Sequence, residues 1–98
     1  MAQRTPQRQS VHDEKVQEIA RSYINRGWVT KADLAGHSQP DTIYGHIPDV
    51  QAVLSNKWEE IVEVETPESL DTDKDQHRAF KRYADERSNT EFKIEVTD

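Results

Sequence analysis

Two acidic runs joined by a short polar break constrain the fold more than any other part of the sequence. The first runs from Ile47 to Leu54 and the second from Glu59 to Glu65, with Ser55-Asn56-Lys57 between them. Both runs are also rich in apolar residues, and two apolar runs around a short polar break are typical of a β-hairpin. We therefore expect both runs to be strands of one sheet.

Three carboxylates would meet at one end of this hairpin, because paired strands lie only about 4.8 Å apart. They belong to Asp49, Glu63 and Glu65. Such a cluster is unfavourable unless a cation or shared protons relieve the repulsion. Hard dications prefer carboxylate oxygens as ligands. The sequence therefore indicates a candidate metal site.

An alternative interpretation is that the acids form the solvated face of a half-buried strand, with Val62 and Val64 on its other face. Two features weigh against this alternative. Ile61 and Val53 lie on the acidic side, which is therefore not wholly hydrophilic. Pro48 also fixes the backbone directly before the first acid of the cluster, which favours a defined direction for that carboxylate.

Composition limits the classes of protein that the chain can represent. A length of 98 residues predicts one domain, which we place over 11–98. Residues 1–10 are expected to form a flexible basic arm. The alternative is that this arm contacts phosphate groups. The absence of cysteine excludes disulfides, thiolate metal sites and cysteine nucleophiles. No apolar run is long enough for a signal segment or a membrane span, so we expect a soluble cytoplasmic protein without membrane contact.

The charge distribution is uneven. The net charge of -6 argues against strong nonspecific binding of nucleic acid by the monomer. The segment Glu59 to Asp75 contains eight acids and one base, Lys74. The helix predicted after it is basic; its bases are Arg78, Lys81, Arg82 and Arg87.

The spacing of apolar residues predicts the remaining elements. In chain order they are a helix over Val11–Arg26 with Ser10 as its N-cap, a short strand over Trp28–Thr30, a loop over Leu34–Tyr44, a polar loop over Thr66–Lys74, a helix with the stripe Ala79, Phe80, Tyr83 and Ala84, and a strand over Phe92–Val96. With the hairpin, the order reads α-β-β-β-α-β. We therefore expect the α/β (α+β) class.

Pro48-Asp49, the hairpin spacer and Glu63-Val64-Glu65 resemble the PD-(D/E)xK motif of restriction-endonuclease-like nucleases. The element order is similar to the core of that superfamily, a small mixed sheet flanked by two helices. Within the superfamily the chain most resembles archaeal Holliday-junction resolvases and their small relatives, over about Val11 to Val96. One position departs from the motif, because Glu65 stands in place of its lysine. Some restriction enzymes are similar in carrying Glu there.

The resemblance implies a metal-dependent nuclease that hydrolyses DNA phosphodiester bonds, with branched or otherwise structured DNA among its expected substrates. Mg²⁺ or Mn²⁺ would be the cofactor, and Asp49 and Glu63 its ligands. Glu65 would hold the attacking water or accept its proton. A homodimer is also expected, because one small domain contacts little DNA.

Three residues outside the hairpin acquire expected roles from the same resemblance. Glu14 would be a catalytic acid acting through a water or a second ion, with Glu18 as the less favoured choice. Gln76 and Arg78 would contact the substrate. The alternative for Glu14 is an exposed acid in the first turn of a helix, and for Gln76 an exposed polar residue.

Two other hypotheses remain. Glu65, the acidic segment and the negative net charge are also compatible with a nuclease-like scaffold that does not cut and serves as a protein-interaction or regulatory module. A generic α/β domain with a coincidental motif would be established if Asp49 and Glu63 pointed to opposite faces of the sheet. His12, His37 and His46 show no HxxxH or comparable ligand spacing, so they predict no zinc site. By the resemblance, the fourth histidine, His77, would lie near the site with Gln76 and Arg78; its alternative is an exposed polar residue of a helix's first turn.

Overall fold

Four strands form one mixed sheet in the computed structural model, which describes residues 6–97. The strands are β1 (Val29–Ala32), β2 (Val50–Leu54), β3 (Trp58–Glu65) and β4 (Thr90–Val96). Their spatial order is β1-β2-β3-β4; β2 is antiparallel to both β1 and β3, and β4 runs parallel to β3. The first five residues of the predicted basic arm lie outside the described residues.

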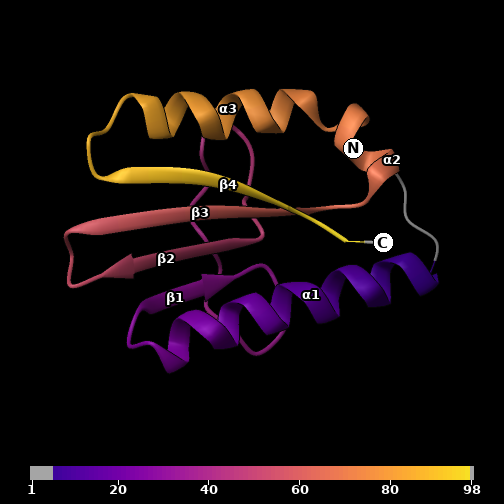
Figure 1. Ribbon diagram of the computed structural model, residues 1–98, viewed down its shortest axis with the longest axis horizontal. Helices are drawn as coiled ribbons and strands as arrows, with labels where there is room; N and C mark the ends of the chain where they lie inside the picture. The colour runs from indigo at the N-terminus through magenta and orange to yellow at the C-terminus, as the bar shows by residue number, and fades with distance from the viewer. Residues whose placement is uncertain (1–5, 98) are drawn as a thin grey trace.

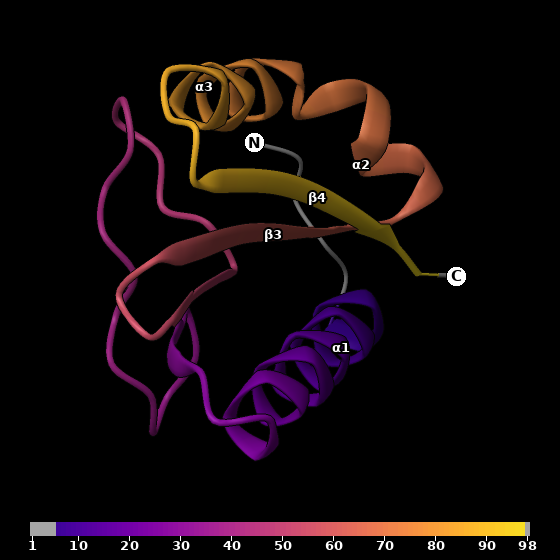
Figure 2. The same cartoon turned by 60° about the vertical axis from the view of Figure 1, so that its left-hand side comes forward.

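Three helices cover the sheet: α1 (Pro6–Asn25), α2 (Pro67–Thr72) and α3 (Lys74–Asp85). Figures 1 and 2 show α1 on one face of the sheet and α2 with α3 on the other. The expected mixed α and β class is confirmed. The chain thus forms three layers, with the sheet in the middle.

The predicted hairpin is confirmed as β2 and β3. Its turn places Ser55 and Asn56 at φ 53° and 56°, the pair of positive angles that a type I′ turn requires. The Lys57 N–H donates a hydrogen bond of 2.9 Å to the Leu54 carbonyl and closes the turn. Pairing of β2 with β3 continues from this turn to the opposite end of β2.

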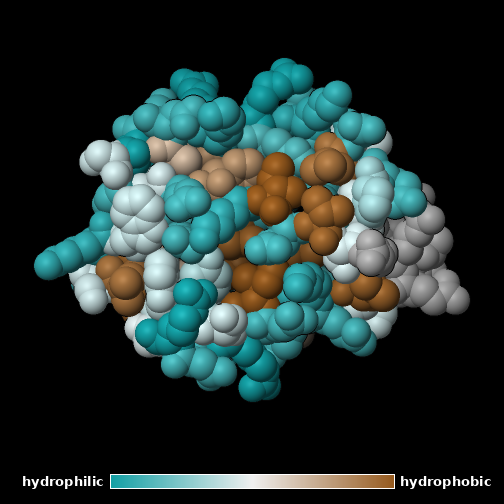
Figure 3. Space-filling view, in the orientation of Figure 1, coloured by the Kyte–Doolittle hydropathy of each residue, from teal (hydrophilic) through white to brown (hydrophobic). Residues whose placement is uncertain are grey.

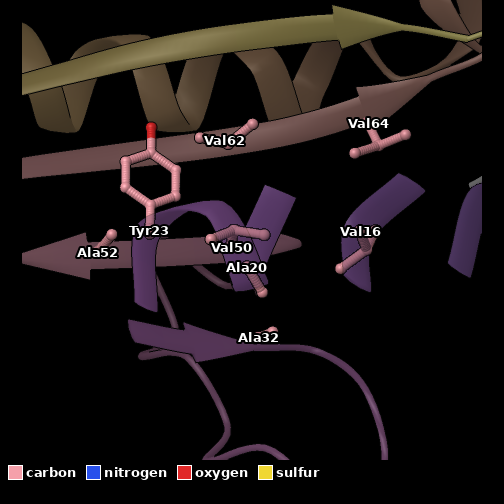
Figure 4. Packing of buried hydrophobic residues seen from close by; sticks show 8 residues of the cluster. All are labelled: Val16, Ala20, Tyr23, Ala32, Val50, Ala52, Val62 and Val64. Carbon is pink, nitrogen blue, oxygen red and sulfur yellow. The ribbon is translucent and has the colours of Figure 1, made fainter. Parts of the chain in front are cut away.

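The core has one part on each face of the sheet. On the α1 face, the helix presents residues at i, i+4 and i+7 to small and branched side chains of three strands. This cluster consists of Val16, Ala20, Tyr23, Ala32, Val50, Ala52, Val62 and Val64 (Figure 4). On the α3 face, Phe80 packs with Ile61 and Ile43. Both helices are therefore fixed to the sheet by apolar contacts.

Three predicted boundaries were wrong. The first helix begins at Pro6, so Ser10 lies inside it and is not its N-cap. The predicted polar loop after β3 contains α2, because the Thr66 hydroxyl accepts the Ser69 N–H while the Ser69 hydroxyl accepts the Thr66 N–H. These reciprocal bonds form a capping box, and Pro67 at the first helical position adds to the start signal.

The strand expected to begin at Ile47 begins at Val50. Pro48 has no N–H to donate to a ladder, and the Asp49 side chain occupies the place of a strand partner, because its Oδ2 accepts the Val64 N–H at 2.8 Å. β3 therefore extends beyond the first residue of β2. Asp49 lies beside this extension, which carries Glu63 and Glu65.

The surface in Figure 3 shows an apolar area between α1 and α3. β4, which lies at this edge of the sheet (Figure 1), exposes Ile94 and Val96 by 39% and 50%. In the described part of the chain, no helix has the length and apolar character that crossing a membrane requires.

Candidate metal centre

Asp49 and Glu63 meet just before β2 begins. The Asp49 N–H donates a hydrogen bond of 2.8 Å to Glu63 Oε1. Asp49 Oδ2 accepts the Val64 N–H and also lies 3.3 Å from His12 Nε2 of α1. The Asp49 N–H therefore positions the Glu63 carboxylate, and the Val64 N–H positions that of Asp49.

Glu63 is an acid in the interior of the molecule, with 4% of its surface exposed. Burial raises the pKa of its carboxyl to about 10, and the charge of Asp49 acts in the same direction, as do Glu65 and Asp73. The hydrogen bond from the Asp49 N–H opposes these effects but is outweighed. Without a cation, Glu63 therefore keeps its proton at neutral pH.

Glu65 is 0% exposed and lies on the same face of β3. The Ser69 hydroxyl of α2 donates a hydrogen bond of 2.5 Å to its Oε2. Its other oxygen, Oε1, lies 3.3 Å from His77 Nε2 of α3, and neither of these two atoms has a hydrogen-bond partner. Burial raises the pKa of Glu65, although the Ser69 hydrogen bond opposes the shift.

Asp73 joins α2 to α3 and is 4% exposed. It is the N-cap residue of α3, but its side chain makes no capping hydrogen bond, and its Oδ1 is buried without a partner. Asp residues at this position usually accept a helix N–H. Its charge contributes to the raised pKa of both Glu63 and Glu65, so it belongs to the same cluster.

These residues fit a metal ion. We call Asp49, Glu63, Glu65 and Asp73 the carboxylate cluster. Ligand atoms of Glu63, Glu65 and His77 lie within 4.8 Å of one another, so these three residues can hold an ion between them. Buried polar atoms rarely lack partners, and each such atom is unfavourable. Three of them, on Glu65, Asp73 and His77, are found at this one place. A bound cation would satisfy them and stabilise the ionised carboxylates.

One alternative from the sequence does not hold. The acids of β3 are not a solvated face, because Glu63 and Glu65 are buried. The generic domain with a coincidental motif stays a hypothesis, because Asp49 contacts Glu63 through its main-chain N–H, while its carboxylate bonds to the Val64 N–H and lies beside His12 of α1. The acidic segment after the hairpin turn is also less exposed than its composition indicates. Four of its eight acids are buried; they are Glu60, Glu63, Glu65 and Asp73.

The other predicted site residues lie further out. Glu14 is exposed and borders a shallow groove between α1 and the loop after β1, together with Gln17 and Leu34. Gln76 is half-buried in the first turn of α3. Arg78 has a 77% exposed side chain and lies 3.8 Å from Asp75. The structure thus joins the Asp49 main chain to Glu63 and groups the ligand atoms of Glu63 with those of Glu65 and His77, while Asp49 and Glu14 lie outside that group.

His12 and Asp73 are site residues that the sequence interpretation missed, and His77 was expected near the site but not as a ligand. A signal existed for His12, because it precedes Val16 by four positions and therefore lies on the buried stripe of α1. Glu14 is two positions away, about 200° around the helix. Nothing in the sequence marked Asp73, because its position depends on α2.

A groove beside the cluster lies between α3 and β4. It is lined by Lys74, His77, Arg78, Lys81, Phe92 and Ile94. His77, with 14% of its side chain exposed, borders both this groove and the buried acids. The groove therefore combines three bases with an apolar floor directly beside the candidate site.

We found no protein-family model, curated protein or solved structure that matches the chain.

Proposed function

We propose that the chain is a metal-dependent nuclease that hydrolyses DNA phosphodiester bonds with Mg²⁺ or Mn²⁺. The observation that supports the proposal is the contact of Asp49 with Glu63 just before β2 begins, next to the buried Glu65. In this proposal the residues of the pattern that resembles the PD-(D/E)xK motif act as one site. An antiparallel β1-β2-β3 unit followed by a parallel β4, with helices on both faces, supports a restriction-endonuclease-like core.

In this proposal Asp49 and Glu63 hold the ion. When bound, it would polarise a phosphate oxygen and lower the pKa of a water molecule. Hydrolysis adds that water across a P–O bond: its oxygen bonds to phosphorus, and the departing oxygen takes up a proton. The chain supplies the positions of the ligands, because Asp49 is fixed by the Val64 N–H and Glu63 by the Asp49 N–H.

The outer face of α3 supports contact with DNA. Lys74, Arg78 and Lys81 follow one another at helical spacing and line the groove beside His77. Phosphate groups along the helix could contact these bases while a sugar or base packs on Phe92. Structured DNA presents phosphates from more than one strand close together, so several of them could contact this small surface at once. A homodimer would double this surface.

A cleavage assay on the full chain tests the proposal. Linear, nicked and branched DNA are incubated with Mg²⁺ or Mn²⁺ and the wild-type protein, Asp49→Asn or Asp71→Asn. Asp71 is an exposed acid of α2 and serves as the matched control. We expect cleavage by the wild type and the control, none by Asp49→Asn and none with a chelator. Cleavage by Asp49→Asn, or no cleavage of any of these substrates by the wild type, would contradict the proposal.

A second candidate function is a scaffold that binds an ion but does not cut. The burial of Glu63 and Glu65 favours it, because cleavage requires a phosphodiester to reach the ion, and these two residues lie in the interior. The site also lacks the motif lysine. Lys81, a possible replacement, pairs instead with Asp85 at 3.2 Å on the surface. Metal binding without cleavage of any substrate, together with capture of a protein partner, would favour this candidate.

A further inference from the structure

One imidazole and two carboxylates border the same buried space between β3 and α3. The ligand atoms of Glu63, Glu65 and His77 lie within 4.8 Å of one another. Glu65 is 0% exposed, and its Oε1 faces His77 Nε2 at 3.3 Å without a hydrogen bond. An ion placed beside these two atoms could bind both.

We infer that this space binds a first-row transition-metal dication in preference to Mg²⁺, with Glu63, Glu65 and His77 as its protein ligands. Imidazole nitrogen suits transition metals, whereas Mg²⁺ is held mainly by oxygen. Mg²⁺ also keeps several of its waters, for which a buried site offers little room. The inference rests on the metal-binding part of the proposed function. It names the class of ion and makes Glu65 a ligand instead of a residue that holds water.

The surroundings orient the ligands. The Ser69 hydroxyl occupies Glu65 Oε2 and leaves Oε1 for the ion. The His77 ring packs against Phe92, with ring centroids 6.1 Å apart. Asp73 adds a buried negative charge that is not used for helix capping. Contacts of this kind around a metal site fix the ligands and raise its affinity.

The test measures binding and does not require activity. Metal-free wild type, His77→Ala and His37→Ala are titrated with Mn²⁺ and Mg²⁺, and pulsed electron paramagnetic resonance detects nitrogen coupled to bound Mn²⁺. His37 is the matched control because it is also half-buried, and its ring bonds to Gln17 on α1, away from the cluster. An amide NMR spectrum of each variant verifies the fold.

We expect the wild type and His37→Ala to bind Mn²⁺ at least about tenfold more tightly than Mg²⁺ and to show nitrogen coupling. In His77→Ala, the coupling should vanish and Mn²⁺ affinity should fall about 10- to 100-fold. Equal affinities for the two ions, or no nitrogen coupling in the wild type, would overturn the inference even if the alanine variant failed to fold.

The two proposals fail in different ways. Nitrogen coupling in a protein that cleaves no DNA would leave the inference standing and remove the proposed nuclease. Cleavage that depends on Asp49 but is unchanged in His77→Ala, with no nitrogen coupling, would leave the nuclease standing and remove the inference.

Discussion

At the scale of single residues, Glu63 is the group whose ionisation depends most on what else occupies the site. Its pKa of about 10 reflects burial first and the neighbouring acids second. Ionised carboxylates in such surroundings require a cation. The same residue is therefore a proton-binding group in the metal-free protein and a candidate ligand when a dication is present.

This predicts the pH dependence of stability in the metal-free protein. The pKa of Glu63 rises from 4.5 to about 10 on folding, so the folded state keeps a proton that the unfolded state has lost. The stabilising contribution is complete below pH 4.5 and is lost as the pH rises towards 10. Glu63→Gln, which is neutral throughout and can still accept the Asp49 N–H, should remove this part of the dependence.

The measurement is chemical denaturation of the wild type and Glu63→Gln with a chelator between pH 5 and 9, in steps of about one unit. The free energy of unfolding should fall more steeply with pH in the wild type. Parallel curves for the two proteins would show that Glu63 ionises normally in the folded state.

At the scale of elements, α2 links the segment directly after β3 to the candidate metal site. Ser69 completes the capping box with Thr66 and also donates to Glu65. Ser69→Ala removes both interactions at a position that is 3% exposed. We expect a loss of about 1–3 kcal/mol in the free energy of unfolding.

Thr72→Ala is the matched control for this substitution. Thr72 is an exposed hydroxyl residue of the same helix, and its side chain bonds only to the carbonyl of Ser69 among the contacts described. Thr72→Ala should lower the free energy of unfolding, measured by urea denaturation, by less than about 0.5 kcal/mol. Equal losses in the two variants would mean that α2 does not depend on its capping box.

α1 is joined to β3 by a polar interaction within the apolar layer. Figure 4 shows the Tyr23 hydroxyl directed towards β3, where it donates a 2.5 Å hydrogen bond to Glu60 Oε1. Trp58 Nε1 and Lys93 Nζ also contact Glu60, at 3.0 and 3.1 Å. Burial opposes the ionisation of Glu60, but these partners outweigh it and lower its pKa.

Tyr23→Phe should destabilise the protein by about 1–3 kcal/mol, because a hydrogen bond to a charged, buried acceptor is lost while the ring is kept. Urea denaturation measures the change. Tyr44→Phe is the control, since its hydroxyl bonds to Glu86 on the surface. If Tyr23→Phe is no less stable than Tyr44→Phe, the buried network does not hold α1 to the sheet.

Elements with regular apolar spacing could be predicted, whereas those set by local hydrogen bonds or tertiary contacts could not. The hairpin and the stripe containing Phe80 needed only periodicity and turn residues. α2 is short and depends on a capping box that the sequence interpretation overlooked. Asp73 and His77 join the site because α2 turns α3 back over β3 (Figure 2), a three-dimensional relation that spacing along the chain does not contain.

At the scale of the whole molecule, the net charge of -6 conceals an uneven distribution. The buried acids contribute little to the surface field if an ion neutralises them, while the bases of α3 remain exposed. DNA should therefore be attracted to one face of the molecule and repelled by others. Binding should be weak and sensitive to salt.

Arg78→Gln should weaken DNA binding at every sequence and reduce the slope of log affinity against log salt by about one. Fluorescence anisotropy of labelled DNA with the Asp49→Asn protein measures binding without cleavage. Arg21→Gln, an exposed arginine on α1, provides the control. An equal effect of both substitutions would show that the groove on α3 is not the DNA-binding surface.

The central claim is that a dication binds in the carboxylate cluster, and residue-resolved NMR during titration with Mg²⁺ and Mn²⁺ tests it most directly. We predict that Mg²⁺ shifts, and Mn²⁺ broadens, the amide signals around Asp49, Glu63 and Glu65, and that both effects vanish in Glu63→Gln, because Glu63 is a ligand in both proposals. Signals that stay unchanged at millimolar ion, or effects confined to exposed acids such as Asp71, would contradict the account.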